Sequence, residues 1–388
     1  MPYDTPELTE QEVLQHAFST LSDHLPLHAE GYTCTTADLL KVLLGVAVNR
    51  GTIEAVCADL VGAPDPQTIR GYLNEQLCVE ELPELERRLN AALAAELPPR
   101  VRRHAQEVAL DYHDRPYYGK TAQAEGLWVR GHAKDGTTRF YRVATASLLL
   151  NGLRLTLALH FVLPTDDTVR VLDTVLKRGQ TLGLRVTCLL LDKGFAGIAV
   201  LDFLTRQHHP ALIACPIRGT TGGTRALCQG RRSYCTTHTF TGAHDLALTA
   251  AVAVCRVFTT ARRTHRLPRR AEWLLFILVQ LQLSPRYARQ LYQGRCGIET
   301  SYRCAGRVRG WTTAKNPAYR FVLIALAFVL LNVWIHLRWI LTQVPRPGRR
   351  WLDTERFQLA RFSTFIRRAL EQCYGCIQTV AAPAVPRC

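Results

Sequence analysis

The chain has 388 residues, which is more than a single hydrophobic core usually holds, so we expect two or three domains. Hydrophobic residues make up 47% of the sequence, an ordinary value that allows a large core, but the net charge of +16 at pH 7 is not ordinary. Six of the 48 basic residues are Lys and the remaining 42 are Arg, whose guanidinium can bind phosphate through two hydrogen bonds. A GC-rich genome would explain the choice of Arg over Lys but not the excess of positive charge, so a polyanionic partner is expected.

The first hundred residues read as a helical domain, which we place at residues 1–104. Short helices separated by tight turns permit a helix-turn-helix DNA reader, with residues 67–73 as the candidate recognition helix. A plain helical bundle explains the same pattern equally well, and the sequence leaves both readings open. The predicted helices span residues 9–22, 36–48, 52–60, 66–77 and 79–97.

Residues 106–218 read as strand, strand, strand, helix, strand, helix, strand, which is the element order of an RNase-H-like α/β core. The first strand, QEVALDY, is expected to end at Asp111, and the turn signal Asn151-Gly152 predicts a hairpin between the next two strands. The fourth strand, VTCLLLD, ends at Asp192. We place the first part of the catalytic core at residues 105–217.

The rest of the chain divides into three further predicted segments. Residues 218–283 read as a β-rich insertion whose loop carries several arginines between residues 262 and 270; this loop would grip DNA or be merely solvated. Residues 284–343 are predicted to belong to the core again and to form two helices, the first polar and the second very apolar. A basic linker, a helix and a tail follow at residues 344–388.

Three acidic residues are candidates for a metal site. Asp111 and Asp192 each lie at or near the carboxyl end of a predicted buried strand, where open α/β sheets place their ligands. Glu299 lies in LYQGRCGIETSYRCAGR, residues 291–307, and the same helical face would carry Tyr292, Arg295 and Arg303. Oxygen ligands alone suit Mg²⁺ or Mn²⁺, and such a site can hold two ions for in-line phosphoryl displacement. A surface helix with Arg-Glu ion pairs is the alternative for Glu299.

The same three acids resemble the DDE triad of insertion-sequence transposases with an RNase-H-like core. Tyr292, Arg295 and Glu299 match the first three positions of the Y-x2-R-x3-E-x6-K signature. Gly306 stands at the fourth position, so Arg303 or Arg307 would take over the lysine's contact with phosphate. Residues 111–119 (DYHDRPYYG) and 191–195 (LDKGF) are similar to the aspartate motifs of the halobacterial-type branch, and Lys193 is a further candidate for a phosphate contact.

This resemblance implies a transposase that uses two Mg²⁺ or Mn²⁺ ions per active site to cut DNA at the ends of an insertion sequence and join them to a target. It implies inverted-repeat and target double-stranded DNA as partners and a homodimer on DNA. A cytoplasmic, nucleoid-associated protein is expected. The alternatives are a metal-dependent DNase and a host-retained DNA-binding protein without transposition activity.

Two features bear on the compartment. The N-terminus is acidic and polar rather than a signal peptide, and the 13 Cys are scattered except for Cys373 and Cys376, which indicates reduced thiols in the cytosol. Residues 321–337 form an apolar run of 17 residues that contains Asn332 and His336. These polar residues would be unfavourable in lipid, so we expect a buried helix rather than a membrane span, and no membrane partner. A membrane-attached basic protein is the alternative.

Overall fold

The computed structural model describes residues 7–98, 101, 104–119, 126–150, 153–242, 246–258, 271–295, 297–346, 349–353 and 355–380. Their contacts divide the chain into two compact units. The helical unit combines Met1–Leu97, Tyr118–Glu125 and Tyr302–Cys388, and the sheet unit combines Pro98–Tyr117 and Gly126–Ser301. Each unit therefore joins segments that are far apart in the sequence. The domain limits near residues 104, 217, 283 and 343 stay predictions.

The first four helices of the helical unit begin within one residue of their predicted starts, because polar side chains cap them. Thr9 and Thr35 form capping boxes, and Asp65 accepts hydrogen bonds from two backbone N–H groups of the helix that it precedes. A salt bridge between Glu54 and Arg70 links the third helix to the fourth, and either reading of this helix pair remains open. The helices are α1 (Glu10–His24), α2 (Thr36–Val48), α3 (Ile53–Asp59), α4 (Pro66–Gln76) and α5 (Leu82–Ala95).

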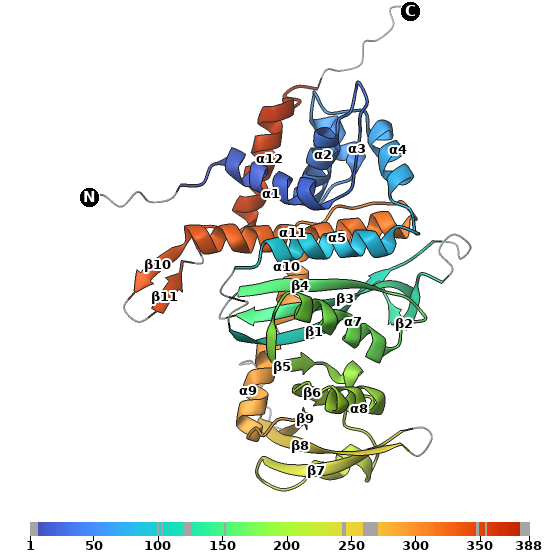
Figure 1. Ribbon diagram of the computed structural model, residues 1–388, viewed down its shortest axis with the longest axis vertical. Helices are drawn as coiled ribbons and strands as arrows, with labels where there is room; N and C mark the ends of the chain where they lie inside the picture. The colour runs from blue at the N-terminus through green and yellow to red at the C-terminus, as the bar shows by residue number, and fades with distance from the viewer. Residues whose placement is uncertain are drawn as a thin grey trace, which may run out of the picture. The chain divides into compact units, whose positions relative to one another are not determined.

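Helix α11 (Pro317–Leu341) forms the core of the helical unit and packs against α1, α2 and α5 (Figure 1). It is the one helix among the described residues that is long and apolar enough to cross a bilayer, and 83% of its most apolar stretch is buried. Asn332 lies fully buried and donates from Nδ2 to the Leu93 carbonyl at 3.2 Å. The structure thus places this apolar run in a protein core.

The helical unit is completed by α12 and a short hairpin. Helix α12 (Leu359–Tyr374) packs on α1 and α2 through its buried face, and β10 (Gln343–Arg346) pairs with β11 (Arg349–Leu352).

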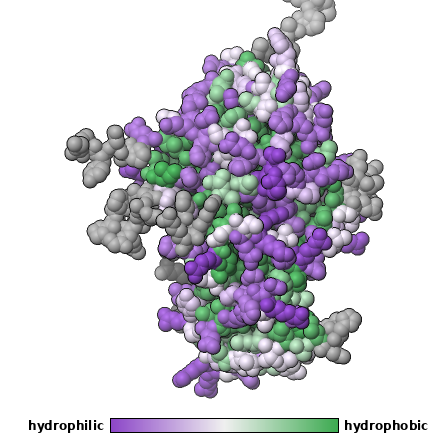
Figure 2. Space-filling model, viewed as in Figure 1, coloured by the Kyte–Doolittle hydropathy of each residue, from purple (hydrophilic) through white to green (hydrophobic). Residues whose placement is uncertain are grey.

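Hydrophilic residues dominate the face of the molecule seen in Figure 2, with smaller hydrophobic areas between them. This distribution is ordinary for a folded protein whose apolar residues are mostly in its cores.

A nine-stranded mixed sheet forms the sheet unit. Along it the strands follow the order β2-β3-β1-β5-β6-β9-β8-β7, and β4 pairs with β3. The part β4-β3-β1-β5-β6 has an antiparallel half joined to a parallel half, because β1 pairs antiparallel with β3 and parallel with β5. The strands are β1 (Ala105–Pro116), β2 (Val129–Lys134), β3 (Thr137–Leu150), β4 (Leu153–Val162), β5 (Arg185–Leu191), β6 (Ala211–Cys215), β7 (Tyr234–Thr241), β8 (Ala247–Phe258) and β9 (Ala271–Val279).

Helices flank this sheet, so the predicted mixed α/β fold class is confirmed. Helix α7 (Thr168–Thr181) packs on β3 and β4 and contacts α8 (Ile198–Arg206), which reaches β8 and β9 (Figure 1). Helix α9 (Pro285–Arg295) packs on β8. The insertion predicted at residues 218–283 contributes β7, β8 and β9, which extend the sheet beyond β6. The turn predicted at Asn151-Gly152 and the basic loop at residues 262–270 lie outside the described residues.

The end of the first strand is a correction. The sequence predicted that it ends at Asp111, but β1 continues to Pro116. Beyond Leu110 the strand loses its partner β5 and keeps its partner β3, with Asp111 opposite Thr145 and Pro116 opposite Phe140. One remaining neighbour is enough to satisfy half of the strand's backbone groups, so the strand runs on past the acid.

Candidate active site

Asp111 and Asp192 reach the same edge of the sheet through the register of two parallel strands. Leu110 of β1 pairs with Leu191 of β5, so the next residue of each chain segment is an aspartate. Asp192 is the first residue after β5, and its Oδ1 accepts a hydrogen bond from the Gly194 N–H at 2.7 Å. This bond caps the short 3₁₀ turn η2 (Lys193–Phe195) and fixes the direction of the Asp192 carboxylate.

Arg295 bridges the two aspartates. This last residue of α9 brings its Nη2 atom to 2.9 Å from Asp111 Oδ1 and 3.9 Å from Asp192 Oδ2. The exposed fraction of its side chain is 11%, against 16% for Asp111 and 33% for Asp192, so the closer ion pair is well shielded from water. The Arg295 guanidinium also lies 5.8 Å from the ring centre of Tyr292, which packs on Phe276.

The pKa of Asp111 is raised to about 6. Burial of its carboxyl group is the main cause, and the charges of Asp192 and Glu299 act in the same direction. Arg295 and the hydrogen bond from the Tyr112 N–H oppose the rise. Glu299 is therefore near enough to repel a proton-free Asp111, although its own side chain lies on the exposed part of α10 (Gly297–Ala305).

The donor set fits a divalent cation. Asp111, Asp192 and Glu299 provide only carboxylate oxygen atoms, which are the ligands that Mg²⁺ and Mn²⁺ prefer, and the charges of Asp192 and Glu299 both act on Asp111. A cation among them would relieve the repulsion at Asp111, which Arg295 and the Tyr112 N–H offset only in part. The sheet unit contains Asp111, Asp192, Arg295 and Glu299, so this grouping lies within one compact part of the chain.

The residue beside Asp111 is held by an aromatic and cationic stack that the sequence did not reveal. Tyr112 stacks on Phe195 with ring centres 5.0 Å apart and an angle of 10° between the planes. The guanidinium of Arg142 lies 4.9 Å from the Tyr112 ring centre and forms two hydrogen bonds with Asp114, at 2.6 and 2.8 Å. This stack connects β1 to the turn that carries Asp192. Asp114 is thus occupied by an ion pair.

The other predicted phosphate contacts are more dispersed. Lys193 is exposed on the turn after Asp192. Arg303 and Arg307 are also exposed, but both belong to the helical unit, where Arg307 lines a hollow of about 320 Å³ with Arg50 and Arg367. Which of the two arginines replaces the signature lysine stays a prediction.

The helix predicted over residues 291–307 appears as α9 and α10, on either side of residue 296, which lies outside the described residues. A single continuous face therefore stays a prediction. A Cβ atom added at Gly297 would meet the guanidinium of Arg154 from β4, which is the far end of a flexible side chain and could move aside. Gly294 lies near Leu149, at an ordinary contact distance for an added Cβ atom.

No protein-family model and no curated protein matches this sequence. Solved structures do match, among them a piggyBac transposase in a cryo-EM synaptic complex with hairpin DNA. That match has a TM-score of 0.54 and covers 95% of this chain and 78% of the other, with 10% sequence identity. At so low an identity the likeness shows a shared, transposase-like fold and nothing finer.

Proposed function

We propose that the protein is a DNA transposase that cuts and joins phosphodiester bonds at the ends of a mobile element. The observation that carries the proposal is the meeting of Asp111 and Asp192 on adjacent parallel strands, with Arg295 between them and Glu299 within electrostatic reach. The fold shared with a transposase solved on hairpin DNA supports the same reading, as does the net charge of +16.

In this proposal Asp111, Asp192 and Glu299 hold two Mg²⁺ or Mn²⁺ ions. When bound, such ions activate the attacking oxygen and stabilise the charge on the leaving oxygen. The chain's own residues position the reactants: the Gly194 N–H fixes Asp192, and the stack of Tyr112 on Phe195 ties β1 to the same turn. Asp111 accepts the ions in its deprotonated form.

Arg295 has two partners in the proposal. Without DNA it neutralises Asp111, the more buried of the two aspartates. Once cations occupy the carboxylates, its guanidinium is available to a phosphate oxygen, which it can bind through two hydrogen bonds. Lys193 and one of Arg303 and Arg307 would contact phosphates farther along the strand. A homodimer on two element ends and a nucleoid-associated protein in the cytoplasm belong to the same proposal.

The decisive experiment compares Asp192→Asn with wild type on DNA that carries the repeats flanking the coding region. We expect Mg²⁺-dependent cleavage by wild type, loss of cleavage by at least about 1,000-fold in the variant, and unchanged DNA binding, because the substitution removes a metal ligand and little else. Asp202→Asn is the matched control, since Asp202 lies on α8, outside the proposed site, and is half-buried in an ion pair with the exposed Arg206. Full cleavage by Asp192→Asn would contradict the proposal.

A second assay separates joining from cutting. Oligonucleotides that end in a free 3′-hydroxyl are incubated with a supercoiled target, and joined products are counted. A transposase forms them without prior cleavage. Cleavage of flanking DNA without any joined product would instead identify a metal-dependent nuclease.

A further inference from the structure

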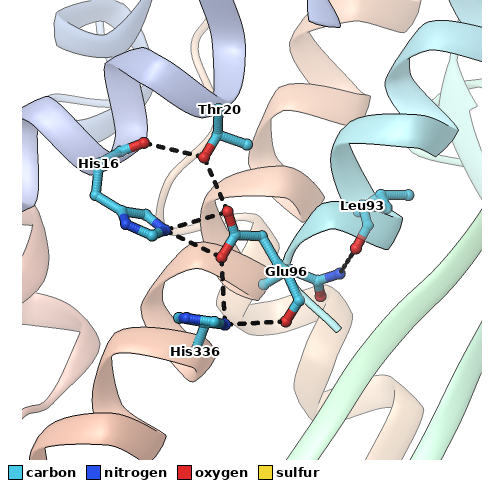
Figure 3. Close-up of polar contacts among 6 residues, drawn as sticks. His16, Thr20, Leu93, Glu96 and His336 are labelled. Atoms are coloured by element: carbon cyan, nitrogen blue, oxygen red, sulfur yellow. Dashed lines mark hydrogen bonds and ion pairs between the residues drawn. The ribbon is translucent and has the colours of Figure 1, made fainter. Parts of the chain in front are cut away.

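A second cluster of metal-binding side chains lies in the helical unit. Glu96, the residue after α5, is buried, and His16 from α1 and His336 from α11 both face its carboxylate (Figure 3). Thr20, one turn after His16, donates to Glu96 Oε1 at 2.8 Å. Two imidazoles and one carboxylate, supplied by three different helices, thus converge on one point.

The ligand atoms of His16, Glu96 and His336 all lie within 4.8 Å of one another, and the two distances to Glu96 are close to those between ligands around a common ion. His16 Nε2 lies 3.2 Å from both oxygens of Glu96, and His336 Nδ1 lies 3.6 Å from Glu96 Oε2. A charge-assisted hydrogen bond would be shorter, about 2.7 to 2.9 Å, and directed at one oxygen. Neighbouring ligands of a tetrahedral Zn²⁺ with bonds of about 2.0 to 2.1 Å are about 3.3 Å apart.

The surroundings of the cluster also suit a metal. The two imidazole rings are stacked with centres 5.5 Å apart and planes 28° apart, so that both present a nitrogen toward Glu96. The Thr20 hydroxyl lies 2.8 Å from Glu96 Oε1 and 2.9 Å from the His16 carbonyl oxygen, and its proton can be donated to the carboxylate, as second-sphere partners of metal ligands commonly do. The side chains of His16 and His336 are 35% and 25% exposed, which leaves a path for an ion and room for water as a further ligand.

We propose that His16, Glu96 and His336 bind one divalent transition-metal ion of the zinc class. The ion fastens α1, the end of α5 and α11 to one another. Nitrogen ligands distinguish this site from the oxygen-only group of Asp111, Asp192 and Glu299, so the two sites select different metals. The alternative is that hydrogen bonds, without a metal ion, hold the three residues together. His336 Nδ1 also lies within hydrogen-bond distance of the Glu96 carbonyl oxygen, at 3.2 Å.

Cobalt spectroscopy of a cysteine variant tests the site without any assay of DNA chemistry. In His336→Cys, a thiolate replaces an Nδ1 ligand, and a cysteine side chain is long enough to reach an ion bound there because the Zn–S bond is longer than the Zn–N bond. Co²⁺ added to the full-length variant should produce a new thiolate-to-cobalt charge-transfer band. The control is His28→Cys, which adds a thiol at an exposed position outside the cluster.

The proposal predicts a band in His336→Cys beyond the background of the 13 native cysteines, and none beyond that background in His28→Cys. Adding Glu96→Gln to His336→Cys should remove the extra band while circular dichroism stays native. Equal spectra for the two cysteine variants would overturn the proposal and leave the hydrogen-bonded cluster.

Thermal unfolding gives an independent measurement. Zn²⁺ that binds only the folded protein raises its melting temperature, so wild type should gain more than His336→Ala at the same Zn²⁺ concentration. Thr20→Val, which keeps all three ligands, should retain most of the gain. The same small Zn²⁺ response in wild type and His336→Ala would contradict a site at these residues. Failure of DNA cleavage would not affect this result.

Discussion

Asp111 is the residue at which stability and proposed function oppose one another. Burial of its carboxyl group, together with the charges of Asp192 and Glu299, raises its pKa to about 6. A metal ligand must be deprotonated, so at neutral pH the folded protein holds an unfavourable charge that a cation would compensate. Arg295 offsets this charge only in part.

Asp111→Asn should therefore stabilise the metal-free protein while it abolishes cleavage. The raised pKa means that wild type loses stability as the pH rises from about 4 through about 6, whereas the amide does not ionise. We expect a gain of about 1 to 3 kcal/mol in unfolding free energy at pH 8, shrinking toward zero near pH 4. Urea unfolding with a chelator at several pH values measures it. A variant less stable than wild type at pH 8 would disprove the expectation.

Gly194 is the second residue whose identity the proposed site requires. A Cβ atom there would lie 2.9 Å from Asp192 Oδ1, so the carboxylate would have to move. Gly194→Ala should lower cleavage roughly 10- to 100-fold and weaken Mg²⁺ binding, because small displacements of reacting groups are expensive. Gly197→Ala in the same loop is the control, since nothing lies within 4 Å of its added Cβ. Equal activity of the two variants would argue against a positioned Asp192.

Most strands and helices of the core were predicted from the sequence because their apolar patterns are strong, whereas the mostly exposed strand β2 was missed. Strand β5 and helix α7, which was predicted over residues 166–179, carry such patterns. The continuation of β1 to Pro116 was missed because it depends on pairing with β3, a partner distant in the chain. The ion pair between Arg295 and Asp111 was missed for the same reason, since 183 residues of sequence between them give no sign of contact.

Helix α11 is the segment that decides whether the protein could insert into a membrane. Most of its apolar surface packs inside the helical unit, and Asn332 is hydrogen-bonded there. We expect the full-length protein to remain at the bottom of a flotation gradient with neutral lipid vesicles, because the unit would have to open before α11 could enter lipid. Vesicles of anionic lipid form the comparison, since a basic surface alone can bind them in low salt. Flotation with neutral vesicles in high salt would favour membrane insertion.

At the scale of the whole molecule, each compact unit joins distant parts of the chain. Residues before 98 and after 301 form the helical unit, so its core cannot be completed until the C-terminal helices have been made. Local sequence patterns predict these N-terminal and C-terminal helices but not that they pack on one another. Domain limits drawn along the sequence therefore assigned them to different domains. The succession of strands and helices in residues 106–218 predicted the α/β fold class, because such a succession has few unstrained topologies, but not that β9, β8 and β7 extend the same sheet.

Iron-directed cleavage of the protein chain shows whether Asp111, Asp192 and Glu299 meet around divalent ions. Fe²⁺ in place of Mg²⁺, with ascorbate and peroxide, generates radicals that cut the backbone beside the bound ion. If the three acids bind the same ions, cuts should appear near residues 111, 192 and 299 and disappear together in Asp192→Asn. Cuts near residues 111 and 192 without one near 299, or a pattern unchanged in the variant, would contradict it.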